Sequence, residues 1–197
     1  MKIGIFGGTF NPIHIGHAII ANYIAQNSDL DEIWLMVAPQ NPLKYADDFG
    51  ASDADRIKMV NMVTEKLDKV CTSEFEFSLP RPSYTYHTLQ ELSRLHPGDE
   101  FFLIIGGDNW ANFNKWKNHE DIVSNYNVLI YPRIGFDKAI MNDYGGSVRL
   151  IDAPIIELSS TEIRAAIQRN QNMSFFLSED VYQYILKNKL YTKNGNR

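Results

Sequence analysis

The sequence predicts an α/β protein with a doubly wound, parallel sheet whose faces are covered by helices. Apolar runs typical of buried strands, such as "MKIGIF", "DEIWLMVA" and "EFFLIIGG", alternate along the chain with amphipathic stretches of helical spacing. Polar turns that contain glycine or proline follow the predicted strands. A length of 197 residues, with 44% hydrophobic and 22% charged residues, suits a single domain over residues 1–197 with a full hydrophobic core.

The first half of the chain reads as three strands and three helices. After the opening strand, "AIIANYIAQ" places isoleucines at helical spacing, and "DEIWLMVA" is the next strand. "SDADRIKMVNMVTEKL" is a helix that Ser52 or Asp53 could cap. "VCTSEFEFS" is predicted as a strand, and "SYTYHTLQELSRLHPG" as a helix that Pro97 and Gly98 end.

The second half continues the alternation. "EFFLIIGG" is the clearest strand, "NKWKNHEDIVSNY" reads as a helix, and "NVLIYP" as a strand. "SVRLIDA" and "IIEL" are predicted as further short strands. The helices "SSTEIRAAIQR" and "SEDVYQYILKNKL", each opened by serine, make residues 159–191 a short C-terminal helical portion of the same domain.

This alternation predicts where a ligand would bind. Strands joined through helices pair in parallel by right-handed crossovers, so their carboxyl ends meet at one edge of the sheet. In such sheets ligands bind at that edge. The turns expected there are "GGTFNPIHIGH", "APQNPLK", "LPRPSYT", "GGDNW" and "YPRIG".

Charge and cysteine content narrow the class of protein. The net charge of −5 disfavours nucleic acid as a partner, although local cations and backbone amides could still hold small phosphorylated ligands. The single cysteine, Cys71, excludes an intramolecular disulfide and is expected to be a buried strand residue. No apolar run has the length of a signal core or a membrane span, so we expect a cytoplasmic protein with no membrane partner.

The stretch "GGTFNPIHIGH" carries the first candidate site. Its glycines, Gly7 and Gly8, allow close backbone approach at a strand-to-helix turn, where free amides and the helix dipole favour an anion. They match neither a dinucleotide fingerprint nor a Walker loop. His14 and His17, three residues apart at the start of a helix, share a face and could donate hydrogen bonds to phosphoryl oxygens.

Other interpretations of the two histidines exist. The H-x-x-H spacing is one residue shorter than the zincin pattern and lacks its glutamate, so zinc is disfavoured and no metal ligand is assigned. Histidines without a chemical task are a second alternative, which the glycine turn and its place after a strand make weaker.

A second motif, "LSSTEIRAAI", offers another phosphate site. Ser159, Ser160 and Thr161 lie at a predicted helix N-terminus, and Arg164 follows one turn later with a rigid fork of donors. The alternative is an ordinary helix cap with a surface arginine.

Both motifs resemble a known superfamily. "GGTFNPIHIGH" is similar to the G-G-[ST]-F-[ND]-P-x-H-x-G-H signature of the HxGH nucleotidyltransferases, and "LSSTEIR" to their I-S-S-T-x-I-R motif. The resemblance implies a Rossmann-like sheet of the nucleotidyltransferase type and transfer of a nucleotidyl group to a phosphate acceptor. "HIGH" is also the signature of class I aminoacyl-tRNA synthetases.

Further stretches resemble the nicotinate mononucleotide adenylyltransferase family. They are "NPLK", "PSYTYHTL", "GGDNWANFNKW", "PRIG" and "VYQYILKNKLY", so the similarity runs over nearly the whole chain. His87 stands where that family usually has aspartate, Gly107 where it has alanine, and Ile134 where it has proline. His87 is expected to alter the orientation of groups near the acceptor pocket.

The resemblance implies a reaction of ATP with nicotinate mononucleotide that yields nicotinate adenine dinucleotide and pyrophosphate, a step of NAD biosynthesis, with Mg²⁺ bound to ATP. The catalytic residues would be His14, His17, Lys44 and Arg164. ATP would be bound by Gly7, Gly8, Thr9, Phe10, His14, His17, Gly106, Asp108, Ser159, Ser160, Thr161 and Arg164. The acceptor would be bound by Lys44, Tyr84, Thr85, Trp116 and Arg133.

Two of these residues also have structural interpretations. Asp108 could bind a ribose or cap a helix, and Trp116 could stack on the pyridine ring or pack its helix onto the sheet. A homo-oligomer is possible.

Other functions stay open from sequence alone. Nicotinamide mononucleotide or pantetheine phosphate could be the acceptor, or the chain could be a non-catalytic nucleotide-binding module. The module is expected to lack His14, His17 or Arg164, all of which are present. A tRNA synthetase would need an anticodon-reading portion that this short acidic chain does not show.

Overall fold

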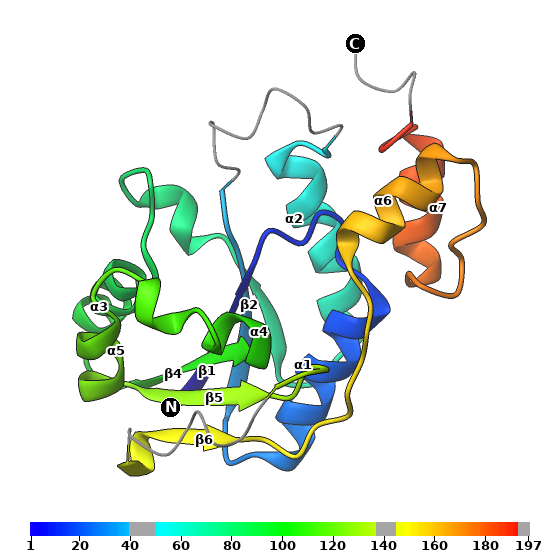
Figure 1. Ribbon diagram of the computed structural model, residues 1–197. Coiled ribbons are helices and arrows are strands. Elements are labelled where there is room, and N and C mark those ends of the chain that lie inside the picture. The colour runs from blue at the N-terminus through cyan, green and yellow to red at the C-terminus, as the bar shows by residue number, and fades with distance from the viewer. Residues whose placement is uncertain (40–49, 137–144, 193–197) are drawn as a thin grey trace.

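The computed structural model describes residues 1–39, 50–136 and 145–192. Its centre is a parallel sheet of six strands in the order β3-β2-β1-β4-β5-β6 (Figure 1). The strands are β1 (Lys2–Gly8), β2 (Glu32–Val37), β3 (Val70–Ser73), β4 (Glu100–Gly106), β5 (Asn127–Tyr131) and β6 (Val148–Leu150). This is the doubly wound order in which β1 and β4 are neighbours, so the predicted fold class is confirmed.

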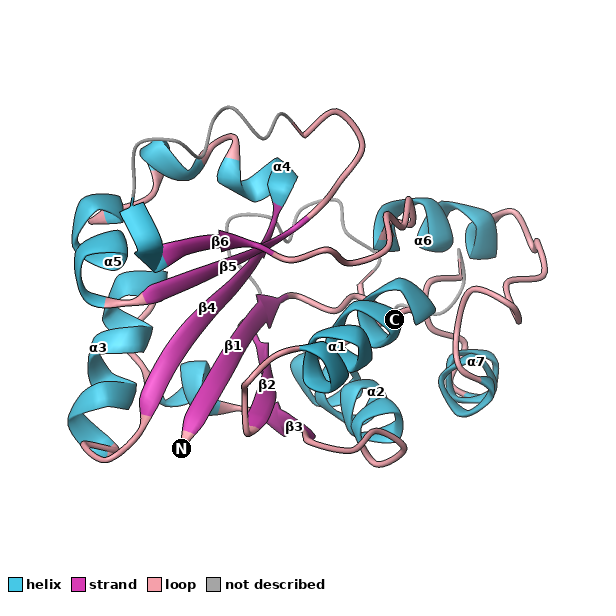
Figure 2. Cartoon of the chain, turned by 90° about the horizontal axis from the view of Figure 1, so that it is seen from below, coloured by secondary structure: helices cyan, strands magenta, loops and turns pink. Residues whose placement is uncertain are grey.

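Helices cover both faces of the sheet (Figure 2). The α-helices are α1 (Ile15–Asn27), α2 (Asp53–Thr64), α3 (Thr85–Leu95), α4 (Gly107–Trp110), α5 (His119–Asn125), α6 (Ser160–Gln168) and α7 (Glu179–Lys187). Helices α1 and α2 lie on one side of the sheet and α3 and α5 on the other. Short 3₁₀ turns, η2 (Phe75–Ser78), η3 (Phe113–Lys115) and η5 (Gly145–Ser147), connect these elements.

Strand alternation divides the buried side chains into two cores, one for each face. Phe6, Leu35 and Ile104 point toward α1 and α2, whereas Ile5 and Leu103 point toward α3 and α5. The C-terminal helices join the first core through buried residues that include Ile163, Val181 and Ile185. Figure 1 shows α6 and α7 beside α2, and we infer from the shared core that they belong to the same domain.

One predicted strand is too long and another is wrong. The strand over "VCTSEFEFS" ends at Ser73, and Phe75–Ser78 form a 3₁₀ turn. The Glu76 side chain there accepts hydrogen bonds from Thr88 and Ser83, which hold the segment against α3 rather than in the sheet. "IIEL" has no strand partner, because the carbonyl of Ile156 accepts a hydrogen bond from Arg133 instead.

Three further expectations need correction. Cys71 is exposed, because β3 is an edge strand. The helix expected over "NKWKNHEDIVSNY" divides into η3 and α5 at Asn118, whose φ of 57° cannot continue a helix. The short helix α4 was expected as a turn.

The cap of α2 gives a stability prediction. Ser52 is the N-cap residue, and its hydroxyl accepts a hydrogen bond from the backbone N–H of Asp55 at 3.1 Å. Ser52→Ala should lower the free energy of unfolding by about 0.5–2 kcal/mol. Urea denaturation measures this loss. Ser178→Ala is the matched control, because the Ser178 hydroxyl at the N-cap of α7 makes no capping hydrogen bond. Equal losses in the two variants would contradict the assignment of the cap.

Candidate nucleotide site at the carboxyl ends of the strands

A cavity of about 260 Å³ opens at the carboxyl ends of β1, β4 and β5. It lies where β1 and β4 send the chain to opposite faces of the sheet, the usual ligand position in such folds. Its lining residues are Phe6, Gly7, Gly8, Thr9, Phe10, His14, Gly16, His17, Ile20, Asp108, Asn109, Tyr131, Pro132, Arg133, Ile156, Leu158, Ser159 and Ser160. The predicted turns after β1, β4 and β5 therefore do meet at one place.

The two histidines form a stacked pair at the start of α1. Their ring centroids lie 3.7 Å apart and the rings are inclined by 19°. His14 is the N-cap residue of α1 and is buried, whereas His17 is partly exposed to the cavity. A β-carbon on Gly16 would come within 3.0 Å of the His14 ring, so the glycine leaves room for this arrangement. The prediction that the two imidazoles share a face is confirmed.

The surroundings keep both imidazoles neutral near neutral pH. Burial, assisted by the nearby Arg133 charge, lowers the pKa of His14 from 6.5 to about 4. Burial also lowers the pKa of His17 well below its usual value, with smaller contributions from His14 and Arg133. The backbone N–H of His14 donates to Nδ1 of His17 at 3.3 Å. This bond leaves the proton of neutral His17 on Nε2, which can then donate to a ligand.

Arg133 supplies the positive charge of the cavity. Its Nη1 donates to the carbonyl of Ile156 at 2.7 Å, and its Nε lies 3.8 Å from a carboxylate oxygen of Asp108. Arg133 is the only Lys or Arg among the described residues that line this cavity. Asp108 is 58% exposed at its side chain. The N-cap of α4 is Gly106, not Asp108, so the alternative interpretation of Asp108 as a helix cap is wrong.

The serine motif reaches the cavity in part. Ser159 caps α6 by accepting from the N–H of Glu162 at 3.2 Å, and Ser160 donates to the carbonyl of Pro12 at 2.9 Å. Arg164 donates to the carbonyl of Asn11 at 2.8 Å. Thr161 and Arg164 are not among the lining residues, so their predicted contact with phosphate stays a prediction.

The acceptor-side residues lie on a separate surface. Tyr84 and His87 line a second cavity of about 600 Å³ with the 78–83 segment, and Thr85 begins α3 beside it. Trp116 is partly buried against the core on the α3 side, its ring centroid 5.5 Å from that of Phe113, so the packing interpretation is observed. The ammonium group of Lys117 lies 4.5 Å from the centre of the Tyr84 ring and links the two regions.

Lys44 and Gly106 are the predicted site residues not yet placed. Lys44 lies outside the residues that the structure describes. Gly106 ends β4 below the cavity, where a β-carbon would come within 2.4 Å of an Asp108 oxygen. Arg133 was expected on the acceptor side, yet it lines the cavity that holds the histidines.

Sequence reasoning missed Tyr131 and Ile156. Burial raises the pKa of Tyr131 to about 12, with a contribution from Asp108. The sequence did offer a signal for Tyr131, because this residue ends the predicted strand and begins the polar turn "YPRIG". Ile156 carried no signal, because its part in the site depends on its backbone carbonyl and on a methyl group near Gly16.

Comparison with known proteins shows the family of this chain. Residues 5–166 match the model of the family described as Cytidylyltransferase-like. The "Probable nicotinate-nucleotide adenylyltransferase" of Bacteroides thetaiotaomicron is 46% identical over 187 residues, which cover 94% of this chain and 91% of that protein. The Flavobacterium psychrophilum protein of the same name is 46% identical over 195 residues, 98% of this chain and 100% of that protein. The chain therefore belongs to the cytidylyltransferase-like family and, within it, to the nicotinate-nucleotide adenylyltransferases.

A solved structure supports the fold. The Plasmodium falciparum nicotinic acid mononucleotide adenylyltransferase complexed with NaAD has a TM-score of 0.82 and 22% sequence identity, and the match covers 96% of this chain and 97% of that chain. At this level of identity the similarity shows the fold alone.

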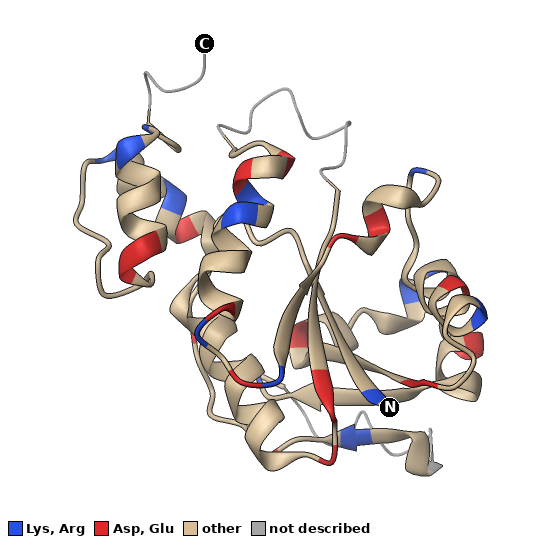
Figure 3. Ribbon diagram, turned by 180° about the vertical axis from the view of Figure 1, so that it is seen from behind, with Lys and Arg blue, Asp and Glu red and all other residues tan. Residues whose placement is uncertain are grey.

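Positive charge is not concentrated on one part of the described chain. Lysines and arginines are dispersed among acidic residues along the described elements rather than gathered in one stripe (Figure 3). Within residues 1–39, 50–136 and 145–192, no helix is long and apolar enough to cross a membrane.

The lowered pKa of His14 predicts a pH dependence of stability. Between about pH 6.5 and pH 4, the unfolded chain binds a proton at His14 that the folded chain does not. The free energy of unfolding should therefore fall as the pH drops through this window, by up to about 1.4 kcal/mol per pH unit for this residue. Urea denaturation at several pH values should show a shallower slope in His14→Gln than in the wild type. An identical slope in both proteins would contradict a neutral, buried His14.

Proposed function

We propose that the chain transfers the adenylyl group of ATP to the 5′-phosphate of nicotinate mononucleotide and releases pyrophosphate and nicotinate adenine dinucleotide. The observation that carries the proposal is the stacked His14–His17 pair beside Arg133, at the carboxyl ends of β1 and β5. The names of the relatives support the choice of reaction and of acceptor.

The reaction requires the protein mainly to position the two substrates and to stabilise negative charge. The acceptor phosphate is already an anion, so its oxygen can attack the α-phosphorus of ATP without a general base on the protein. A bond to that oxygen forms while the bond to the β-phosphate oxygen breaks, and pyrophosphate leaves with its electron pair. Catalysis then consists of alignment and of stabilising charge on the phosphoryl oxygens.

The described residues suit these tasks. The Nε2–H of neutral His17 would donate to an α-phosphate oxygen, while His14 stacks against its ring and limits its rotation. The Arg133 guanidinium would offset phosphate charge, and the N-terminus of α1 adds its dipole. Asp108, half-exposed at the cavity mouth, would accept hydrogen bonds from a ribose.

Residues that are not among the described lining of this cavity would complete the proposed site. Arg164 would hold the leaving phosphates with Thr161, and Lys44 would help to bring the two anions together. Tyr84, Thr85 and Trp116 would bind the acceptor, in the region where Tyr84 lines the second cavity.

Mg²⁺ would enter with ATP. Among the described residues, no group of three or more His, Cys, Asp or Glu side chains could hold a metal ion, and Asp108 is the only carboxylate of the cavity lining. Phosphate oxygens would therefore supply most of the ligands, as Mg²⁺ commonly accepts. Bound to the triphosphate, the ion would neutralise charge on the leaving pyrophosphate.

The proposed function predicts which product forms and which substitution lowers kcat. Purified protein with Mg²⁺, ATP and nicotinate mononucleotide should release pyrophosphate and form the dinucleotide, measured by a coupled pyrophosphate assay and by chromatography. His17→Ala should lower kcat by about a hundred- to a thousandfold, because one donor to the transition state is lost.

The controls separate site and substrate. His96→Ala should retain wild-type rates, because His96 ends α3 at the opposite edge of the sheet. Nicotinamide mononucleotide and pantetheine phosphate are the comparison acceptors. Faster turnover of either one would contradict the proposed acceptor, and turnover of none would leave a nucleotide-binding module as the better description.

A further inference from the structure

Phe10, in the turn after β1, has a backbone conformation that must be held by its surroundings. Its φ is 45°, in the left-handed region that residues with a β-carbon seldom adopt. The side chain is 2% exposed and has no polar atom that could stabilise the conformation locally. Such a conformation costs on the order of 1–3 kcal/mol and persists where neighbouring groups fix it.

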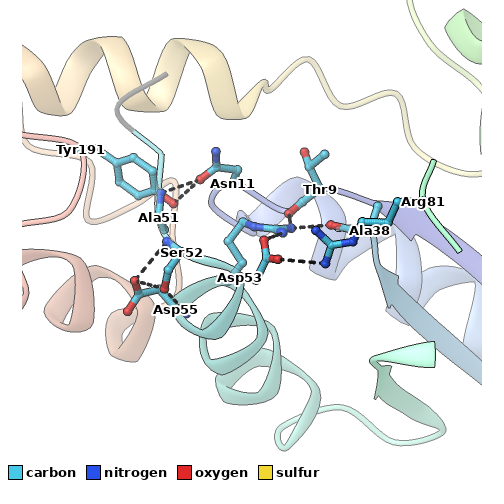
Figure 4. Close-up of polar contacts among 10 residues, drawn as sticks. Thr9, Asn11, Ala38, Ala51, Ser52, Asp53, Asp55, Arg81 and Tyr191 are labelled. Atoms are coloured by element: carbon cyan, nitrogen blue, oxygen red, sulfur yellow. Dashed lines mark hydrogen bonds and ion pairs between the residues drawn. The ribbon is translucent and has the colours of Figure 1, made fainter. Parts of the chain in front are cut away.

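Arg56, on helix α2, holds the peptide group that precedes Phe10. Its side chain is fully buried, and its Nη1 donates to the carbonyl oxygens of Thr9 at 2.5 Å and Ala38 at 2.8 Å (Figure 4). Its Nη2 donates to Asp53 at 2.5 Å, which neutralises the buried charge. The Thr9 carbonyl lies in the peptide plane whose nitrogen belongs to Phe10, so fixing this oxygen restricts φ at Phe10.

The chain on the other side of Phe10 is held as well. Asn11 accepts at its side-chain oxygen from the backbone N–H of Ala51 at 3.2 Å and from the Tyr191 hydroxyl at 2.8 Å (Figure 4). Its carbonyl oxygen accepts from Arg164. The contacts of Arg56 and Asn11 therefore bracket the strained residue.

The conformation of Phe10 directs its ring into the cavity wall. A β-carbon on Gly8 would come within 3.0 Å of the ring, so Phe10 lies close against the glycine turn. The ring also meets the His17 imidazole edge-on, with centroids 5.0 Å apart and an interplanar angle of 82°. Phe10 thus connects the peptide that Arg56 holds with the imidazole that faces the phosphate site.

We infer that Arg56 is a positioning residue for adenylyl transfer: by holding the Thr9 carbonyl it orients Phe10, which in turn fixes His17 and the Gly8–Thr9 turn. The inference rests on the proposed function, because it assigns Arg56 to the same site. Arg56 itself is not among the residues that line the cavity. An arginine is required because its two terminal nitrogens reach three acceptors in fixed directions, whereas a lysine offers one nitrogen.

The test compares Arg56→Lys with Val63→Ala. Lysine keeps the charge but loses the fork, so the Thr9 carbonyl is no longer fixed. We expect kcat/KM for ATP to fall about ten- to a hundredfold, the scale of a misplaced catalytic group. Val63→Ala removes buried methyl groups from the same helix without touching Thr9. It should lower Tm and leave the kinetic constants unchanged.

A spectroscopic readout distinguishes positioning from stability. The Cε1–H resonance of His17, assigned by its loss in His17→Ala, senses the ring current of Phe10. It should shift in Arg56→Lys and stay at its wild-type position in Val63→Ala. A lower Tm in Arg56→Lys, with wild-type kinetics and an unshifted resonance, would overturn the inference.

Phe10→Leu tests the route of the effect. It should lower kcat/KM for ATP and shift the same resonance with Arg56 intact. The double variant should be no slower than the slower single variant, because both changes interrupt one connection. Effects that multiply would overturn the route through Phe10.

The test still gives an answer if Arg56→Lys does not fold or if the wild-type protein is inactive. If Arg56→Lys does not fold, Phe10→Leu and Asp53→Asn carry the test, since the latter removes the charged partner of Arg56, together with the weaker ion pair to Arg81, and should shift the His17 resonance in the same direction. If the wild-type protein transfers no adenylyl group, the proposed function fails. The His17 resonance still reports whether Arg56 positions this ring.

Discussion

The structure depends on the opposite directions in which the chain leaves the two central strands, β1 and β4. These strands are neighbours in one parallel sheet, but α1 leaves β1 toward one face and α4 leaves β4 toward the other. The chain leaves the two strands in opposite directions, and the turn after β1 and the start of α1 line the cavity at this point. The cavity with His14, His17 and Arg133 follows from this topology, as does the approach of turns from distant parts of the sequence.

The proposed site would bind anionic substrates although the whole chain is acidic. Its net charge is −5, and Arg133 is the single Lys or Arg of the described cavity lining. In the proposed reaction, neutral imidazole donors and the dipole of α1 would stabilise phosphoryl oxygens without many fixed cations. Burial supports this arrangement, since the lowered pKa values keep both imidazoles uncharged and allow them to stack.

The turn after β1 is held by Arg56 of helix α2, a residue that does not line the cavity. Burying a guanidinium is costly unless its charge and its donors are satisfied, and the two terminal nitrogens of Arg56 donate to two carbonyls and a carboxylate. Asp53 also lies 3.8 Å from Arg81, in the segment that leads to Tyr84. Helix α2 thus contacts the surroundings of both cavities without lining the first one.

Sequence alone determined the elements with strong local signals. The apolar runs of β1, β2, β4 and β5, the cap at Ser52 and the pair His14 and His17 were all predictable, because strand burial, capping and helical spacing act over a few residues. These elements fixed the topology and hence the edge at which the site lies. The class of reaction followed from the resemblance of the two phosphate motifs to a known superfamily.

Only the tertiary structure decided the rest. Sequence did not show that Arg133 would join the histidines, that Tyr131 and Ile156 would complete the wall, or that Arg56 would hold Thr9 from another helix. It misjudged Cys71 and "IIEL", because edge position and strand pairing are properties of the assembled sheet. Hydrogen bonds between segments far apart in the chain have no local pattern, so geometry in three dimensions was needed to assign them.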